Sequence, residues 1–177
     1  MFELTAENYY SLEANRHYMS CSQYQDFLEC EAWAMAKLQG RWTDEDSKAF
    51  LVGKYFHTYF EGPEAHDAFC RANFEKIFKT RETKTGIVVN GKYADFENAD
   101  KMIAVAMNDP TIKRFVDMPG LNEHILTGEI FGVPWRIRLD KYAPEKRLII
   151  DYKTCANIQE TKYNPATGQR ETFVETY

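Results

Sequence analysis

Three regularly spaced carboxylates and one lysine mark residues 127–154 as a stretch that could do chemistry. Glu129, Asp140 and Asp151 are spaced eleven positions apart, and Lys153 lies two positions beyond the last of them. Carboxylates that gather beside an ammonium group repel one another unless a cation compensates them, and hard oxygen ligands suit Mg²⁺ or Mn²⁺. Such a cation makes its bound water more acidic, and a nearby amine can orient that water. This set of side chains therefore predicts the hydrolysis of phosphodiesters.

Three short strands would place these groups at one edge of a sheet. The predicted strands are Ile125–Phe131, Trp135–Tyr142 and Arg147–Lys153, separated by turns at Gly132-Val133-Pro134 and Ala143-Pro144-Glu145-Lys146. Side chains alternate along a strand, so Asp151 and Lys153 are expected to share one face. Neighbouring antiparallel strands lie about 4.8 Å apart, so Asp140 and Asp151 can lie side by side.

The order of these residues resembles the PD-(D/E)XK motif of the restriction-endonuclease-like nuclease superfamily. Asp140 supplies the first acid and Asp151-Tyr152-Lys153 the rest of the motif, with Leu139 in the place of the proline. The stretches RIRLDKY and LIIDYKT resemble the RecE-like exonucleases of phages and prophages, which are also similar to lambda exonuclease and the RecB nuclease domain. The alternative interpretation of so short a motif is a solvated hairpin with charges at its ends.

A histidine on a predicted helix joins the set through the same resemblance. Gly53, His57 and Glu61 recur every four positions in the helix predicted over Thr43–Glu61, so they share one stripe. The spacing matches the helix before the sheet in RecE- and RecB-like nucleases, where the histidine binds or abuts the metal and the glycine allows close approach. A neutral imidazole can bind Mn²⁺ or Mg²⁺. The alternative is a histidine packed among the neighbouring aromatic side chains.

The resemblance implies a role for each residue. The implied catalytic residues are Lys153, Asp140, Asp151 and Glu129, and the implied metal ligands are His57, Glu129, Asp140, Asp151 and Tyr152. In this assignment the backbone carbonyl of Tyr152 completes the shell of one Mg²⁺ (or Mn²⁺) ion, and His57 and Glu129 hold a second ion or position the first. Lys153 orients the nucleophilic water and offsets the charge that develops in the transition state.

The first 120 residues are predicted to be mainly helical. Helices are expected over Thr5–Leu12, from an N-cap at Ser22 with its capping-box partner Gln25 to Gly40, over Pro63–Phe78 and over Phe96–Met107. A β-hairpin with an Asn90-Gly91 turn is expected over Gly86–Tyr93. Positive charge gathers around it, at Arg71, Lys76, Lys79, Arg81 and Lys84. Such a cluster is either a solvated face or a contact to phosphates.

Length and composition fit one globular domain, and the resemblance implies the α/β class. The chain has 177 residues, of which 44% are hydrophobic, enough for a core. We expect a single restriction-endonuclease-like domain over residues 1–177. It would have a helical half (1–120), a mixed sheet built on the catalytic three-strand β-meander (121–154) and a polar tail (155–177). The relatives continue into a helix with a Gln-x-x-x-Tyr motif and a further strand. In the tail, only Gln169–Phe173 resembles this motif, and only loosely, so we expect the closing helix and strand to be missing.

Charge and cysteine content limit the partners. The net charge is −5, so a contact to DNA must depend on a local basic patch and metal ions rather than on bulk charge. The four cysteines show no CxxC spacing, which indicates reduced thiols in a cytoplasmic protein. Relatives with an iron–sulfur cluster use three C-terminal cysteines, and only Cys155 lies on that side, so no cluster is expected. No run has the length of a membrane span.

These expectations combine into a metal-dependent DNA exonuclease of phage or prophage recombination or of DNA end processing. The implied substrate is linear double-stranded DNA ends. The resemblance also points to a single-strand annealing protein as a partner and leaves a homo-oligomer open. One alternative is a catalytically inactive DNA-binding or regulatory module with the same fold. Another is an interaction domain with an incidental acidic hairpin.

Overall fold

The protein folds into two compact units, each built from segments distant in the sequence. The computed structural model describes residues 2–44, 47–84, 86–155, 157–164 and 167–176. The N/C unit consists of Met1–Glu45, His124–Leu139 and Cys155–Tyr177, and the central unit consists of Asp46–Glu123 and Asp140–Thr154. Helices and antiparallel strands occur together, so the predicted mixed α/β class is confirmed. Among the described residues, no helix is long and apolar enough to span a membrane.

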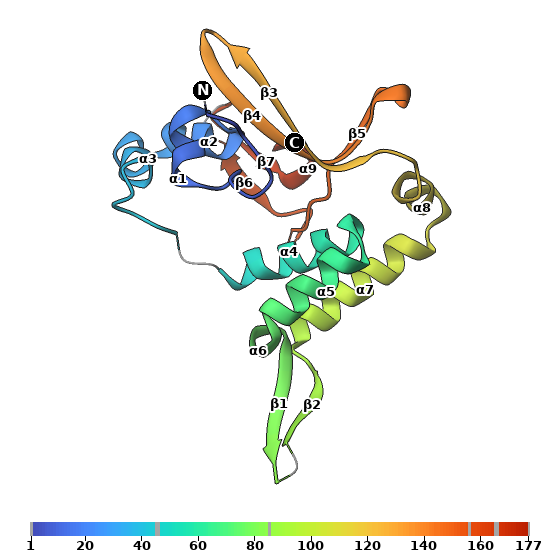
Figure 1. Ribbon diagram of the computed structural model, residues 1–177. Coiled ribbons are helices and arrows are strands. Elements are labelled where there is room, and N and C mark those ends of the chain that lie inside the picture. The colour runs from blue at the N-terminus through green and yellow to red at the C-terminus, as the bar shows by residue number, and fades with distance from the viewer. Residues whose placement is uncertain (1, 45–46, 85, 156, 165–166, 177) are drawn as a thin grey trace. The chain divides into compact units, whose positions relative to one another are not determined.

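Three short helices open the N/C unit, α1 (Leu12–His17), α2 (Cys21–Glu29) and α3 (Glu31–Leu38) (Figure 1). The helix predicted from Thr5 is wrong, because α1 begins only after Ser11. The Ser11 hydroxyl accepts a hydrogen bond from the Ala14 amide and caps the helix there. Gly40, with a φ of 72°, follows the C-cap of α3, where a helix stop was predicted.

A capping box starts α2. The Ser20 hydroxyl accepts from the Gln23 amide, and the Gln23 side chain accepts in turn from the Ser20 amide. The box predicted at Ser22 and Gln25 is therefore wrong by two positions. The single helix predicted here is interrupted at Cys30, whose φ of −159° and ψ of 105° are extended.

The helices of the central unit are α4 (Lys48–Glu61), α5 (Pro63–Ala72), α6 (Phe74–Ile77), α7 (Ala94–Asn108) and α8 (Pro110–Val116) (Figure 1). The predicted cap of α4 at Thr43 is wrong, because the Ser47 hydroxyl accepts from the Phe50 amide and starts the helix there. The predicted stop at Gly62-Pro63 is confirmed, and a φ of 145° at Gly62 explains the need for glycine.

Two further helix boundaries follow from local hydrogen bonds. The helix predicted over Pro63–Phe78 is two helices, because Asn73 leaves the helical region and its side-chain amide donates to the Phe69 carbonyl at 3.0 Å. The helix predicted over Phe96–Met107 is confirmed by α7, and the Asp109 side chain then caps α8.

The core of the central unit is formed mainly by α4 and α7. It consists of Leu51, Tyr55, Phe60, Ile77, Phe96, Ala99 and Ile103. The rings of Tyr55 and Phe96 meet edge to face with centroids 5.3 Å apart. The Tyr55 hydroxyl donates to Asp100 at 2.7 Å, and the Lys92 ammonium donates to the Tyr55 oxygen at 2.6 Å and to Asp100 at 2.7 Å. These bonds fix Lys92, at the end of the adjoining hairpin, to the helices.

That hairpin consists of β1 (Phe78–Thr83) and β2 (Gly86–Lys92), which pair antiparallel and project from the helices of the central unit (Figure 1). The prediction of a smaller hairpin over Gly86–Tyr93 is therefore wrong, because β1 is its other strand. Asn90-Gly91, predicted as the turn, lies inside β2 where the pairing register shifts, as in a β-bulge. A φ of 107° at Gly91 suits glycine at this point.

The predicted meander is present as β3 (Leu121–Ile130), β4 (Val133–Ala143) and β5 (Leu148–Ile150), in the order β3-β4-β5. The first two strands are longer than predicted. The third was predicted to continue to Lys153 and ends at Ile150, because the Tyr152 amide donates to the Asp140 side chain instead of to a strand. Asp151 and Lys153 therefore lie beyond β5 rather than on one of its faces.

Residues with left-handed backbone make the two turns of this sheet. The first turn was predicted at Gly132-Val133-Pro134, but it is formed by Phe131 and Gly132, whose φ values of 52° and 76° fit a two-residue type I′ turn. The second turn is confirmed as the 3₁₀ segment η1 (Pro144–Lys146), followed by Arg147 with a φ of 51°.

A second small hairpin lies in the last segment of the chain. β6 (Thr161–Asn164) pairs antiparallel with β7 (Gln169–Thr172), and α9 (Phe173–Thr176) follows. The predicted turn at Thr167-Gly168 is confirmed by a hydrogen bond from the Gly168 amide to the Asn164 carbonyl at 2.8 Å. The turn predicted at Asn164-Pro165 lies in part outside the described residues.

Candidate functional site

The central unit contains most of the residues predicted to form a site. His57 lies on α4, Asp140 on β4, and Asp151, Tyr152 and Lys153 follow the end of β5. The predicted ligand Glu129 lies on β3 in the N/C unit, where its side chain is exposed. Its participation in a common site stays a prediction.

His57 and Asp140 form the closest pair of predicted ligands. The Nδ1 atom of His57 lies 3.5 Å from Oδ2 of Asp140, and the two side chains are 26% and 13% exposed. This separation exceeds that of a normal hydrogen bond. It matches two donors that share one ion, since ligands at about 2.1 to 2.3 Å from a metal stand about 3 to 3.5 Å apart.

The Asp140 carboxylate is held in place by the backbone that follows β5. Its Oδ2 atom accepts a hydrogen bond from the Tyr152 amide at 2.6 Å. A hydrogen bond to an ionised acceptor is shorter and stronger than one between neutral groups. Asp140 is thereby bonded to Tyr152, the residue whose carbonyl is a predicted metal ligand.

The ring of Tyr152 anchors this segment to the core of the central unit. It stacks on Phe60 with centroids 4.6 Å apart and an angle of 21° between the rings. It also meets the imidazole of His57 edge to face at 6.3 Å. Burial raises the pKa of the Tyr152 hydroxyl, and the negative charge of Asp140 raises it further. Tyr152 therefore stays neutral. Its ring packs against α4 and so holds the neighbouring residues Asp151 and Lys153 near that helix.

Asp151 and Lys153 are paired with each other. The Lys153 ammonium lies 2.8 Å from Oδ1 of Asp151, and the side chains are 36% and 48% exposed. The structure therefore brings together His57 with Asp140 and Asp151 with Lys153. Within the described ranges, no three His, Cys, Asp or Glu side chains lie close enough together to hold an ion.

A glycine brings α4 close to the same segment. A Cβ atom added at Gly53 would lie 3.3 Å from Oγ1 of Thr154, which is tighter than an ordinary van der Waals contact. This agrees with the expectation that Gly53 allows close approach of the helix. Thr154 is therefore the partner of that approach, which the motif alone did not identify.

Two supporting residues were missed at the level of sequence. Phe60 follows His57 by three positions, so it lies on the same side of α4, and that spacing was the available signal. Lys141 follows Asp140 and is 7% exposed, with its ammonium donating to the Val116 carbonyl. Burial lowers the pKa of Lys141. No sequence pattern marks a lysine for such a buried position.

These donors fit a hard divalent cation in part. A carboxylate oxygen and an imidazole nitrogen can occupy adjacent positions of an octahedral shell, and Mg²⁺ usually keeps several waters. A shift of the exposed Asp151 side chain away from Lys153 would add a further oxygen. Among the described side chains, His57 and Asp140 are the two predicted ligands that already lie within reach of one ion.

Comparisons with known proteins point in the same direction. Residues 20–177 match the model of a family described as a PDDEXK-like domain of unknown function (DUF3799). The chain is also similar to a crystal structure at 2.19 Å resolution named "Putative exonuclease" from Eubacterium rectale, with 38% identity and a TM-score of 0.77. The match covers 99% of this chain and 62% of that one, so the chain spans less than two thirds of its length. No curated protein matched the chain.

Proposed function

The chain belongs to this family of PDDEXK-like domains, and on that premise we propose that it is a nuclease that hydrolyses phosphodiester bonds of DNA with Mg²⁺ or Mn²⁺. The restriction-endonuclease-like fold is shown by the family match and by the similar crystal structure. The observation that carries the proposal is the 3.5 Å approach of His57 Nδ1 to Asp140 Oδ2, next to the Asp-x-Lys segment of residues 151–153.

Exonuclease action is the finer part of the proposal. It is supported by the name of the similar crystal structure from Eubacterium rectale and by the resemblance to RecE-like enzymes. We extend it to linear double-stranded ends as substrate, to phage or prophage recombination or DNA end processing, and to the cytoplasm. A single-strand annealing protein and further copies of the chain are the partners that this role would need, and residues 1–177 would act as one nuclease domain.

The proposed metal ligands are Asp140, Asp151, His57, the Tyr152 carbonyl and, for a second ion, Glu129. A bound divalent cation supplies Lewis acidity to the phosphoryl oxygen and makes a coordinated water more acidic. The Tyr152 amide keeps one Asp140 oxygen fixed, so that carboxylate loses little freedom when a ligand arrives. The Phe60–Tyr152 stack keeps the following residues at a set distance from α4.

Lys153 has the proposed role of orienting the attacking water and offsetting charge at phosphorus. Its side chain is 36% exposed and its ammonium is bonded to Asp151, so this role needs the ammonium to turn from that carboxylate toward a substrate phosphate. Donors aimed at the charge that develops in a transition state contribute about 10²- to 10³-fold in rate. The role of Lys153 therefore depends on where the segment after β5 is held, which Tyr152 and Thr154 determine.

Cleavage of end-labelled linear DNA with Mg²⁺ tests the proposal. Asp140→Asn and Lys153→Ala are expected to lower the rate by about a hundredfold or more. The matched controls Asp67→Asn and Lys101→Ala change exposed residues of α5 and α7 and are expected to cleave like the wild type. Resistance of a closed circular substrate would support exonuclease action. Unchanged rates in the two site variants would contradict the assignment, and DNA binding without cleavage by the wild type would favour the inactive binding module.

A further inference from the structure

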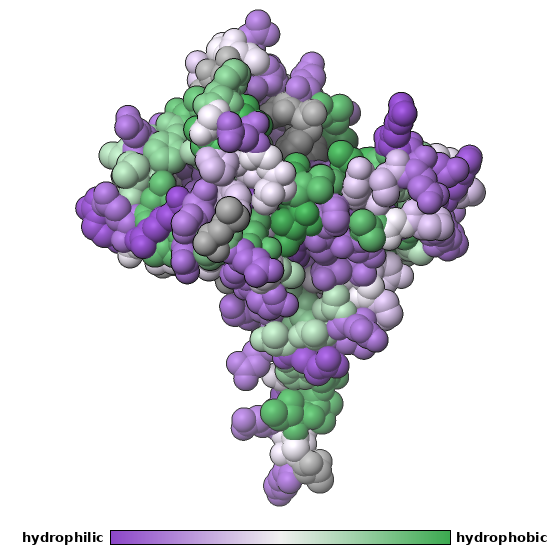
Figure 2. All heavy atoms as spheres, turned by 45° about the horizontal axis from the view of Figure 1, so that its top comes forward, coloured by the Kyte–Doolittle hydropathy of each residue, from purple (hydrophilic) through white to green (hydrophobic). Residues whose placement is uncertain are grey.

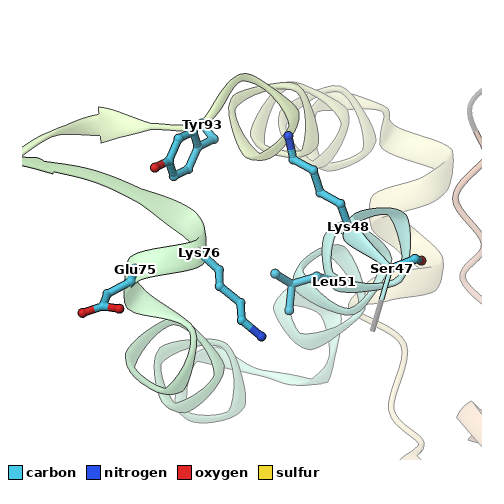
Figure 3. A pocket seen from close by; sticks show the side chains of 6 residues that line it. All are labelled: Ser47, Lys48, Leu51, Glu75, Lys76 and Tyr93. Atoms are coloured by element: carbon cyan, nitrogen blue, oxygen red, sulfur yellow. The ribbon is translucent and has the colours of Figure 1, made fainter. Parts of the chain in front are cut away.

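A pocket at the base of the β1–β2 hairpin lies apart from the residues described above. Its volume is about 350 Å³, within the range of ligand pockets. The residues that line it are Ser47, Lys48, Leu51, Glu75, Lys76 and Tyr93 (Figure 3). All of them belong to the central unit. The pocket combines an aromatic ring, an aliphatic side chain and two ammonium groups.

The two lysines of the pocket come from different elements. Figure 3 shows Lys48 on α4 and Lys76 on α6, with Leu51 directed into the space between them and Glu75 directed away from it. Among the described residues, no ion pair involves Lys76. Lys48 pairs with Asp95, but the two side chains are 65% and 46% exposed, and an exposed pair of this kind is weak. Both ammonium groups are therefore available to an anion.

The hairpin continues this positive charge on one of its faces. Residues directly opposite each other in an antiparallel pair point to the same side, and Arg81 pairs with Val88 while Glu82 pairs with Ile87. Alternation then places Lys79 on the face of Arg81 and places Glu82 on the opposite face. Glu82 thus lies on the other face of β1 from Lys79 and Arg81. No acidic partner of Lys79 or Arg81 occurs in the described part of the chain.

The opposite face of the hairpin has two exposed apolar side chains as well as Glu82. It carries Ile87 and Val89, which are 66% and 46% exposed. Figure 2 shows hydrophobic and hydrophilic surface side by side on the projecting hairpin. Lys92 is excluded from the basic face, because it lies opposite Phe78 and is bonded to Tyr55 and Asp100. The basic face of the hairpin is therefore defined by Lys79 and Arg81.

The pocket and the basic face are connected through Tyr93. The Tyr93 amide donates to the Ile77 carbonyl at 3.0 Å, which closes the base of the hairpin and sets the ring beside the pocket. The Lys79 ammonium lies 6.0 Å from the centroid of that ring. Tyr93 is 41% exposed, so part of this residue faces solvent. Tyr93 thus lies beside the pocket that Lys48 and Lys76 line, and near Lys79 of the basic face.

We propose that the pocket and the basic face of the hairpin bind a single-stranded segment of DNA, with a base stacked on Tyr93 and phosphates at Lys48, Lys76, Lys79 and Arg81. The choice of DNA rests on the proposed function. Proteins that bind single strands combine a cationic path along the backbone with aromatic rings on which bases stack. The bases of a duplex are already stacked inside the helix, so they could not use the Tyr93 ring.

The distance to the candidate metal ligands suits one continuous strand. Lys48 and His57 lie nine residues apart on α4, which corresponds to about 14 Å along the helix axis. A strand of a few nucleotides covers this distance. The net charge of −5 also means that a local path of cations, rather than bulk charge, must attract a polyanion.

Fluorescence anisotropy of a labelled oligothymidylate of about 15 nucleotides, in EDTA to prevent cleavage, tests the inference. Tyr93→Leu is expected to weaken binding about tenfold, and Tyr93→Phe, which keeps the ring, to bind like the wild type. The double variant Lys79→Gln/Arg81→Gln is expected to weaken binding and to reduce the slope of log K against log salt by about 1.4, since each phosphate contact contributes about 0.7.

A matched control separates the two faces of the hairpin. Thr80→Asp/Val89→Asp changes the net charge by the same amount on the other face, and it is expected to alter the salt slope much less. Equal effects of the two double variants, or unchanged binding by Tyr93→Leu, would overturn the inference. Equal affinity for thymidine monophosphate, or tighter binding of a blunt duplex of the same sequence, would overturn it as well.

A failure of this binding inference can be told apart from a failure of the proposed nuclease function. Binding is measured without a divalent cation, so it does not depend on the chemistry at Asp140. If Asp140→Asn abolishes cleavage while Tyr93→Leu binds normally, the inference falls and the proposed function stands. If the Tyr93 and hairpin variants behave as expected while the wild type cleaves nothing, the inference stands and the proposed function falls.

Discussion

The Nδ1 atom of His57 lies 3.5 Å from the Oδ2 atom of Asp140, although 83 positions of sequence separate the two residues. The distance is too long for a hydrogen bond and close enough for two ligands of one ion. The pair exists because α4 and the end of β4 are joined through Tyr152, which bonds to Asp140 by its amide and stacks on Phe60 by its ring.

The first prediction concerns the stability of the protein in the presence of metal. Mn²⁺ is expected to raise the melting temperature of the wild type, because a ligand that binds only the folded state stabilises it by about 2.7 kcal/mol at a hundred times its Kd. Asp140→Asn is expected to abolish the increase, and His57→Gln to reduce it. Differential scanning fluorimetry across a Mn²⁺ titration measures both, with Asp67→Asn as the control. An undiminished increase in Asp140→Asn would rule out this carboxylate as a ligand.

The second prediction concerns the stack beneath the site. Phe60 is 9% exposed, so Phe60→Ala is expected to lower the free energy of unfolding by about 3 to 5 kcal/mol and to loosen Tyr152. Phe50 lies on the same helix but is 57% exposed, and Phe50→Ala is expected to change stability by less than about 0.5 kcal/mol. Urea unfolding of the two variants provides the measurement. Similar losses in both would show that the stack contributes little.

The third prediction concerns a close approach of backbone segments in the central unit. A Cβ atom at Gly120 would lie 2.8 Å from the Tyr142 carbonyl oxygen, so Gly120→Ala is expected to cost about 1 to 3 kcal/mol of stability. Gly128 on β3 has no atom within 4 Å of the corresponding position, and Gly128→Ala is expected to be neutral or stabilising by about 0.5 kcal/mol. Thermal melts compare the two variants, and a neutral Gly120→Ala would refute the steric argument.

The fourth prediction concerns alkaline pH. Burial raises the pKa of Tyr55 to about 12, against the hydrogen bond from Lys92, which lowers it. The unfolded chain titrates this tyrosine near pH 10, so it loses the proton first. The stability that the group contributes is therefore fully present below about pH 10 and is lost as the pH rises toward 12.

The melting temperature of the wild type is accordingly expected to fall more steeply above about pH 10 than that of Tyr55→Phe, which cannot ionise at this position. Circular dichroism melts at a series of pH values record both slopes. Because the phenylalanine also loses the bonds to Asp100 and Lys92, only the slope and not the absolute temperature is compared. Parallel curves for the two proteins would contradict the raised pKa.

Helix ends were predicted correctly where they depend on the backbone properties of the residues at that position. Gly62-Pro63 ends α4 as predicted, since positive φ and a missing amide are properties of those residues alone. Caps were predicted less well. Ser11, Ser20 and Ser47 each lie within a few positions of other residues able to cap, and only the packing of each helix decides which hydroxyl is used. The turn predicted at Asn90-Gly91 was wrong because these residues form a bulge inside β2, although Asn-Gly is also typical of a hairpin turn.

By itself the sequence determined the chemistry available to the protein: an ordered set of His57, Glu129, Asp140, Asp151 and Lys153 on an α/β pattern. Spacing along a strand or helix is a local property, so it could be read without coordinates. The tertiary structure alone decided which members meet, placing His57 against Asp140 and Lys153 against Asp151. It also decided that β5 stops at Ile150, because the Tyr152 amide gains more from the carboxylate of Asp140 than from another strand. Contacts of this kind depend on side-chain packing between distant segments, and no periodicity in the chain encodes them.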